Sequence, residues 1–247
     1  MSHPIEGKTI LVTGANRGIG RSFVEVFLEN GAAKAYAAVR SLENALPLVE
    51  QFGGRVVPLE LDLVDEESIA EAARMASDVD VVINNGGVLT TTQPLAEEAF
   101  DSLDFEIDVN VKGLVRMARA FAPVLEANGG GVFGQLNSLA SLKAFAGFST
   151  YSASKAAAYS LTQSLRETLG ERGIRVISIH PGPIATDMGS TAGLDDIAEP
   201  PELVPRATLA AIESGDFHVF PDTMARKVGE AYQSFASSIV EQDLMEE

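Results

Sequence analysis

The order of apolar and amphipathic segments constrains the fold of this chain more than any other feature. Short runs rich in valine and isoleucine alternate with longer amphipathic stretches along most of the sequence. This alternation is typical of repeated βαβ units, in which helices cover both faces of a parallel sheet. We therefore predict an α/β fold with a doubly wound, parallel, seven-stranded sheet. Strands are expected at residues 9–13, 35–39, 56–61, 79–84, 132–137, 175–180 and 217–220, and helices at 18–30, 65–77, 97–127, 151–172, 202–214 and 223–241.

One domain is expected over residues 1–247. The length lies between one and two average domains, and α/β chains of about 250 residues often form one unit. No linker-like tract, internal repeat or charge block divides the chain, although residues 195–205 have the composition of a loop. The helix at about 223–241 is expected as an addition at the C-terminal end of this domain.

Charge and composition exclude several classes of partner. Eighteen basic and 35 acidic side chains give a net charge of −17, so the surface repels polyanions, and we expect neither a nucleic-acid nor a membrane partner. The chain has no cysteine and three scattered histidines, His3 among them, which predicts no metal site. It starts with no signal-like segment and contains no long apolar run, so the expected location is the cytoplasm.

Glycine and polar residues gather where the predicted strands end, which is where doubly wound sheets bind their ligands. Segment 13–20, TGANRGIG, follows the first strand and opens a helix. Its glycines suit a pyrophosphate, because backbone N–H groups can approach the ligand with no Cβ in the way; the alternative is a glycine-rich turn without a ligand. At two further strand ends, Asp62 could accept a hydrogen bond from the adenine amino group, or could be a helix cap or loop residue, and segment 84–87 could lie beside a ribose, or could be a simple turn.

Tyr151 and Lys155 lie four residues apart at the start of a predicted helix, which places both on one face. Ser138 ends the strand before them. A tyrosine that exchanges protons with a carbonyl or alcohol oxygen needs a pKa near neutrality, and one ammonium about 4 Å away can lower its pKa by about three units. Lys155 is therefore expected to tune Tyr151. The spacing alone is a weak signal, because it arises by chance in roughly one such chain in ten.

Together these motifs resemble those of the short-chain dehydrogenase/reductase family, whose sheet is of the Rossmann type. The resemblance covers about residues 8–186 and rests on TGxxxGIG at 13–20, NNxG at 84–87, DVNV at 108–111, Ser138, YxxxK at 151–155 and PG…T at 181–186. It implies that Tyr151 is the catalytic acid/base and that Ser138 orients the substrate. Lys155 would then lower the pKa of Tyr151 and bind the nicotinamide ribose, and Asn110 would hold a water in the proton relay. The expected cofactor contacts are Gly14, Asn16, Arg17, Gly18, Ile19, Gly20, Arg40, Asp62, Leu63, Asn84, Gly86, Tyr151, Lys155, Pro181, Gly182, Ile184 and Thr186.

The sequence also departs from the family pattern. Gly86 stands where the family usually has alanine, which removes a methyl group from the adenosine wall. Gln135 and Asn137 replace a common asparagine and serine on the fifth strand, so we expect the shape of the pocket to differ. The frequent glycine pair near the C-terminus is absent, and residues 220–222, FPD, lead into the added helix instead.

The end of the second predicted strand indicates which dinucleotide is used. It ends at Arg40, no carboxylate follows before Glu43, and Arg17 lies in the neighbouring glycine turn. In this fold an acidic residue at this place selects NAD, whereas an arginine accommodates the 2′-phosphate of NADP. We therefore expect NADP(H) rather than NAD(H) as the cofactor; the alternative is that Arg40 is simply a solvated surface residue.

The expected activity is reduction of a ketone or aldehyde, or oxidation of a secondary alcohol, by hydride transfer. The candidate pocket residues are mostly apolar and indicate an apolar small-molecule substrate: Val88, Leu139, Ala140, Phe145, Phe148 and Met188. Two alternatives stay open. One is a β-ketoacyl-thioester reductase whose acidic carrier protein docks near Arg116 and Arg119, and the other is a non-catalytic module that senses dinucleotides. A homo-oligomer, dimer or tetramer, is expected from an apolar face on the predicted helix 97–127, formed by Val111, Leu114, Val115, Ala118, Phe121 and Ala122.

Overall fold

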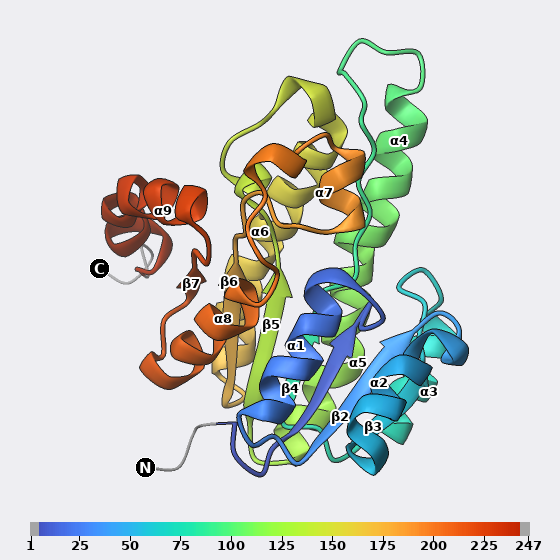
Figure 1. The fold of residues 1–247 in the computed structure, drawn as a ribbon. Coiled ribbons are helices and arrows are strands. Elements are labelled where there is room, and N and C mark those ends of the chain that lie inside the picture. Colours follow the sequence, from blue (N-terminus) through green and yellow to red (C-terminus); the bar gives the residue numbers. More distant parts are fainter. Residues whose placement is uncertain (1–4, 243–247) are drawn as a thin grey trace.

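Seven parallel strands form the centre of the computed structural model, which describes residues 5–242 (Figure 1). His3 lies outside the described residues. The strands are β1 (Thr9–Thr13), β2 (Lys34–Val39), β3 (Val56–Glu60), β4 (Val81–Asn84), β5 (Gly131–Leu136), β6 (Ile174–Ile179) and β7 (His218–Val219). Their order in the sheet is β3-β2-β1-β4-β5-β6-β7, so the direction of winding reverses between β1 and β4. The prediction of a single α/β domain with a doubly wound, seven-stranded parallel sheet is confirmed.

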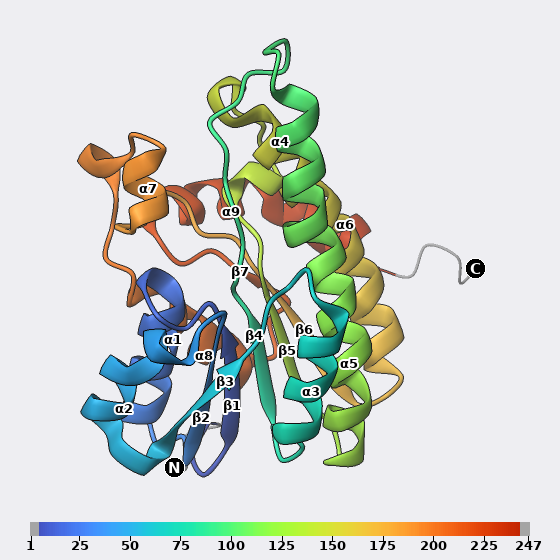
Figure 2. The same ribbon diagram turned by 90° about the vertical axis from the view of Figure 1, so that its right-hand side faces the viewer.

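Helices cover both faces of this sheet (Figure 2). They are α1 (Gly18–Glu29), α2 (Leu46–Phe52), α3 (Glu66–Met75), α4 (Ala99–Glu106), α5 (Gly113–Ala127), α6 (Ser149–Gly170), α7 (Asp187–Thr191), α8 (Leu203–Ser214) and α9 (Thr223–Phe235). Side chains alternate along β1 because strand residues point to opposite faces in turn. Ile10 and Val12 pack with α1 and α8, whereas Leu11 packs with α3, α5 and α6.

The segment expected as one helix over 97–127 is not continuous. It consists of α4, a π-helical segment (Ile107–Lys112) and α5. A π turn widens the helix locally and is frequent at functional sites, and hydrophobic periodicity does not reveal it. Two short helices, α2 and α7, were not expected, and α8 begins inside the segment 195–205 that reads as a loop.

The apolar face used to predict association is mostly part of this chain's own core. Leu114, Ala118, Phe121 and Ala122 are buried between α5 and the sheet, and only Val115 of the six residues is exposed. Homo-oligomer formation therefore stays a prediction that this face no longer supports.

The helix α9 is attached to the sheet edge through Asp222, which is fully buried. One carboxylate oxygen accepts a hydrogen bond from the N–H of Gly182 at 2.6 Å, and the other caps α9 by accepting from the N–H of Ala225 at 2.9 Å. This side chain therefore joins the loop after β6 to the start of α9. Within residues 5–242, no helix is long and apolar enough to cross a membrane.

We predict that Asp222→Ala lowers the free energy of unfolding by about 2–4 kcal/mol, because it removes a helix cap and a charge-assisted hydrogen bond inside the protein. Chemical denaturation followed by circular dichroism measures this change. Asp196→Ala, which removes an exposed aspartate, is the control and should change the value by less than about 0.5 kcal/mol. A loss for Asp222→Ala as small as that of the control would contradict the prediction.

Candidate active site

Two adjoining cavities lie at the carboxyl ends of the central strands. The first has a volume of about 320 Å³ and the second of about 460 Å³. Six residues line both: Ile19, Asn85, Gly87, Leu136, Thr186 and Met188. The cavities are therefore two parts of one cleft, at the edge of the sheet where the sequence placed the ligand.

The glycine turn after β1 lines the first cavity. A Cβ at position 20 would lie 2.2 Å from the carbonyl oxygen of Gly14, so only glycine fits there. Gly18 has φ +51°, and a Cβ on it would lie 2.9 Å from Cγ2 of Thr186. No side chain caps α1, whose N-cap is Arg17. The first N–H groups of α1 therefore remain available at the cavity, which suits a pyrophosphate.

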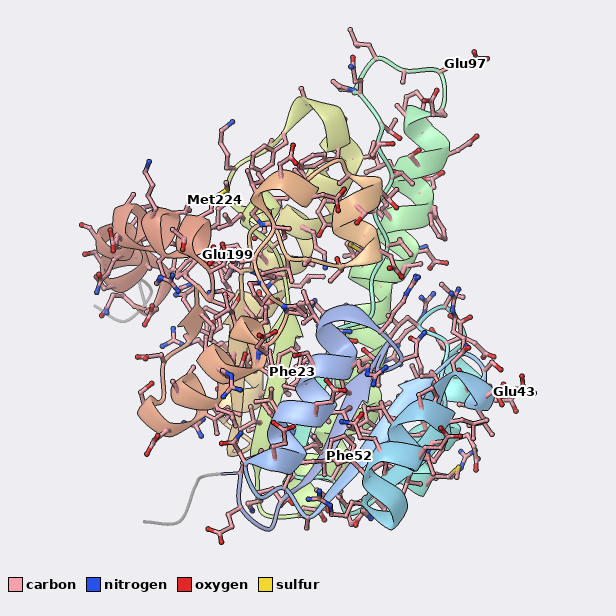
Figure 3. All side chains as sticks on the ribbon, viewed as in Figure 1. Phe23, Glu43, Phe52, Glu97, Glu199 and Met224 are labelled. Carbon is pink, nitrogen blue, oxygen red and sulfur yellow. The ribbon has the colours of Figure 1, made fainter. Side chains whose placement is uncertain are left out.

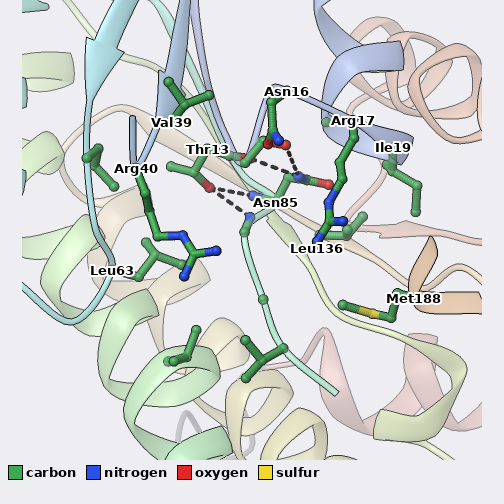
Figure 4. Close-up of a pocket in the computed structure, with 18 of the residues that line it drawn as sticks. Thr13, Asn16, Arg17, Ile19, Val39, Arg40, Leu63, Asn85, Leu136 and Met188 are labelled. Carbon is green, nitrogen blue, oxygen red and sulfur yellow. Dashed lines mark hydrogen bonds between the residues drawn. The ribbon is translucent and has the colours of Figure 1, made fainter. Parts of the chain in front are cut away.

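Thr13 connects this turn to the segment that follows β4 through hydrogen bonds. Its hydroxyl oxygen accepts hydrogen bonds from the N–H groups of Asn85 and Gly86, both at 2.9 Å. The Asn85 side chain in turn donates to the carbonyl oxygen of Thr13 at 2.8 Å. Figure 4 shows these bonds in the middle of the first cavity. They hold the ends of β1 and β4 together and set the width of the cleft.

Two arginines reach toward the first cavity from either side of Asn85 (Figure 4). Arg40 is exposed and has no ion-pair partner among the described residues. Arg17 is paired with Asp187 at 2.7 Å, and both side chains are about 70% exposed. An ion pair this exposed contributes little free energy, so Arg17 can exchange Asp187 for another anion.

Most of the expected cofactor residues line the cleft, including Gly14, Asn16, Ile19, Asp62, Leu63, Gly86, Pro181, Gly182, Ile184 and Thr186. The Asp62 carboxylate also accepts a hydrogen bond from the N–H of Val64, which is the loop role weighed as the alternative. Asn84 does not line either cavity. Its side chain is buried within the sheet and bonds Thr13 and Gln135 instead. The neighbouring Asn85 lines both cavities in its place.

The second cavity contains three of the four expected catalytic residues, Ser138, Tyr151 and Lys155. Tyr151 and Lys155 are buried, and the Lys155 Nζ lies 5.8 Å from the centre of the Tyr151 ring. Five of the six candidate pocket residues also line this cavity, whereas Val88 lines the first. The substrate side of the cleft is thus largely apolar around a small polar group.

Asn110 lies in the π-helical segment and lines neither cavity. Its Oδ1 accepts from the N–H of Val88 at 2.9 Å, and its Nδ2 donates to the carbonyl oxygen of Val88 at 2.9 Å. A Cβ added to Gly87 would lie 3.0 Å from Asn110 Oδ1 and 3.5 Å from Lys155 Nζ. Glycine at position 87 therefore leaves room for both Asn110 and Lys155 beside this segment, a role that its motif does not reveal.

Burial sets the protonation of the tyrosine–lysine pair. It raises the pKa of Tyr151 to about 12, although the nearby Ser138 hydroxyl acts in the opposite direction. Burial also lowers the pKa of Lys155 to about 8. The Lys155 Nζ donates a hydrogen bond to the carbonyl oxygen of Leu136 at 2.8 Å. Burial, Ser138 and Glu106 account for the shift of the Tyr151 pKa, so the expectation that Lys155 lowers this pKa stays a prediction.

Met224 was missed by sequence reasoning. It lies where α9 begins, next to the loop that carries Glu199 (Figure 3), and it lines the second cavity with Leu194 and Ile197. All three residues belong to segments after β6, where no motif marks them. Within residues 5–242, no group of His, Asp and Glu side chains is arranged to hold a metal ion.

Comparisons with known proteins agree with this geometry. A family model described as short chain dehydrogenase matches residues 8–196. The chain is 29% identical to the NADP-dependent 3-hydroxy acid dehydrogenase of Schizosaccharomyces pombe, over 89% of this chain and 92% of that protein. It is 35% identical to a sorbitol dehydrogenase of Cereibacter sphaeroides, over 73% and 72% of the two chains. A crystal structure of a short chain dehydrogenase from Burkholderia cenocepacia in complex with NADP is 35% identical, with a TM-score of 0.83 over 94% of this chain and 97% of that one.

The chain therefore belongs to the short-chain dehydrogenase/reductase family. It is an oxidoreductase that acts on an alcohol or carbonyl group of a small molecule and uses a nicotinamide dinucleotide.

The lowered pKa of Lys155 predicts how stability depends on pH. Between about pH 8 and 10.5 the unfolded chain binds this proton and the folded chain does not, so stability rises with pH through this window. Relative to Lys155→Met, the free energy of unfolding of the wild type should rise by about 3 kcal/mol across it. Tyr151 is present in both proteins, so its titration cancels in the difference.

Urea denaturation at a series of pH values measures this difference. Lys143→Met, which removes an exposed lysine, is the control and should give a difference that does not change with pH. A Lys155→Met difference that is equally flat would show that burial does not hold the lysine pKa below its usual value.

Proposed function

We propose that the protein is an NADPH-dependent reductase of apolar ketones or aldehydes, with Tyr151 as the proton donor. The observation that carries this proposal is the position of Ser138 with the buried Tyr151 and Lys155 around one end of an apolar cavity that is continuous with the glycine turn. A phenol whose pKa is about 12 keeps its proton at neutral pH, which suits the reductive direction. A reduced nicotinamide, when bound, supplies the hydride.

The roles of the protein groups follow from their positions. Ser138 can donate a hydrogen bond to the substrate oxygen, because its hydroxyl lines the cavity and accepts from the N–H of Ala140 at 3.1 Å. Tyr151 gives its proton to the same oxygen as negative charge develops there. Lys155, with a pKa near 8, is close enough to neutrality to take part in replacing that proton. Asn110 keeps the segment beside Lys155 in place and would fix the water of the relay.

The choice of NADPH rests on local charge. Arg40 lies at the end of β2 with an unpaired guanidinium, and no carboxylate of the described residues that line the first cavity lies at that strand end. A doubly anionic phosphate needs such local cations on a chain of net charge −17. The relatives support the choice, since one is named NADP-dependent and another was crystallised with NADP.

The two alternatives fit less well. Arg116, one of two residues expected to dock an acidic carrier protein, is largely buried and pairs with Asp108 at 2.9 Å, so only Arg119 remains exposed. This argues against a β-ketoacyl-thioester reductase that uses that face. A dinucleotide sensor would not need Ser138, Tyr151 and Lys155 together at one cavity.

Tyr151→Phe should lower kcat for ketone reduction by about a thousandfold, because it removes the proton donor and keeps the ring. The Kd for NADPH, measured by fluorescence, should change less than about threefold. Tyr36→Phe, a buried tyrosine on β2, is the control and should keep kcat within about twofold. If the loss for Tyr151→Phe is below about tenfold while chemistry limits the rate, the role of Tyr151 is wrong.

Arg40→Asp should remove or reverse the cofactor preference. We expect the wild type to favour NADPH over NADH by at least about tenfold in kcat/KM, since each charge-assisted hydrogen bond contributes about 1.5–3 kcal/mol. Lys227→Asp makes the same change of net charge on α9, at the opposite edge of the sheet (Figure 1), and should leave the preference unchanged. Equal or better use of NADH by the wild type would contradict this reading of Arg40.

A further inference from the structure

A carboxylate is buried beside the catalytic residues and has no role in the mechanism described so far. Glu106, the last residue of α4, is 0% exposed. Its Oε1 accepts hydrogen bonds from the N–H and the hydroxyl of Thr90, at 2.7 and 2.8 Å. Its Oε2 has no hydrogen-bond partner among the described residues. Burial of a carboxyl group with an unsatisfied oxygen is costly, so this placement of Glu106 needs a physical explanation.

Glu106 and Asn110 hold the same extended segment. They lie four residues apart along the helical path, about 6 Å from one another. Their partners, Val88 and Thr90, lie two residues apart in the segment after β4, about 6.6 Å in an extended chain. Because these spacings match, the two side chains bind alternate peptide groups of one strand-like segment. We call this arrangement the 88–90 clamp.

The clamp contacts the immediate neighbours of both catalytic residues. The Thr90 hydroxyl lies 3.4 Å from the hydroxyl of Thr150, which precedes Tyr151. Asn110 Nδ2 donates to Ser154 Oγ at 3.0 Å, and Ser154 precedes Lys155. The clamp therefore fixes the first turns of α6 at two successive points.

The charge of Glu106 also acts on the catalytic pair. It opposes the effect of burial on Lys155 and adds to the effect of burial on Tyr151, so it raises the pKa of both groups. Two neighbouring titratable groups do not supply this negative charge. Asp108 pairs with Arg116 at 2.9 Å. His180, which faces Lys155 from the end of β6, is neutral because burial lowers its pKa to about 3.

We propose that Glu106 is a positioning residue of the active site, which holds the 88–90 segment against α6 and supplies the buried negative charge that balances the Lys155 ammonium. The proposal rests on the proposed function, in which Tyr151 and Lys155 are the catalytic pair. It assigns a role to a side chain that lines neither cavity and acts on the catalytic pair from behind it.

Glu106→Gln tests the charge, because it keeps the shape and one acceptor oxygen. The descending limb of the pH profile of kcat for carbonyl reduction should move to lower pH by about half a unit to one unit, with KM changed less than about threefold. Asp104→Asn removes an exposed carboxylate from the same helix and is the matched control, which should leave the profile unmoved. A Glu106→Gln profile that overlays the wild-type profile overturns the proposal.

A second measurement needs no turnover. The ultraviolet absorbance of tyrosinate is titrated in the wild type and in Glu106→Gln, and the corresponding Tyr151→Phe proteins identify the contribution of Tyr151. A lower apparent pKa of Tyr151 in Glu106→Gln supports the proposal, and an unchanged value overturns it. If that shift occurs but the wild type reduces no carbonyl compound, the proposed function fails while the placement of the Glu106 charge stands.

Thr90→Val tests the clamp and also covers the case in which Glu106→Gln does not fold. It removes the hydroxyl that binds Glu106 and Thr150 but keeps the carboxylate. We expect KM to rise about threefold to tenfold, with no shift of the pH profile. An unchanged KM overturns the positioning role of the clamp.

Discussion

Burial of the Lys155 ammonium is the constraint on which the rest of the active site depends. The side chain is 4% exposed and donates to the carbonyl oxygen of Leu136. A charge in such a place is tolerated only when polar groups around it compensate for the lost water. The Leu136 carbonyl, at the end of β5, and the Glu106 carboxylate, at the end of α4, do so. The positions of β5 and α4 relative to α6 therefore allow both groups to stabilise the charge on the Lys155 Nζ.

The cleft has two chemically different halves. The first cavity presents backbone N–H groups, a glycine turn and arginines, which suit phosphates. The second is lined mostly by apolar side chains around Ser138 and Tyr151. In an apolar site each hydrogen bond is electrostatically stronger than in water. Burial of Lys155 and Tyr151 thus lowers the stability of the fold, but it also makes a few polar atoms sufficient for catalysis. Such a trade-off between stability and activity is common in enzymes.

Much of the fold could be predicted from the sequence because its signals are local. The bounds of β1 match the expected 9–13, and the glycine turn lies where its motif placed it. Tyr151 and Lys155 share a helix face because their spacing requires it. Features that arise from contacts between distant segments could not be predicted. Hydrophobic periodicity does not reveal the π turn at Asn110, and the roles of Glu106 and Met224 depend on which loops pack beside them.

Strand register explains why the two departures from the family pattern at β5 have different effects on the substrate pocket. Both Gln135 and Asn137 were expected to alter the pocket. Gln135 pairs in register with Asn84, to which its Oε1 is bonded at 2.8 Å, and it lines neither cavity. Asn137 lies just beyond the end of β5 and lines the second cavity, while its Nδ2 donates to Ser178 Oγ at 2.9 Å. Asn84 and Gln135 are hydrogen-bonded to one another inside the sheet, so the side chain that reaches the cleft at the end of β4 is that of Asn85. Of the two departures, only Asn137 can therefore shape the substrate side of the site.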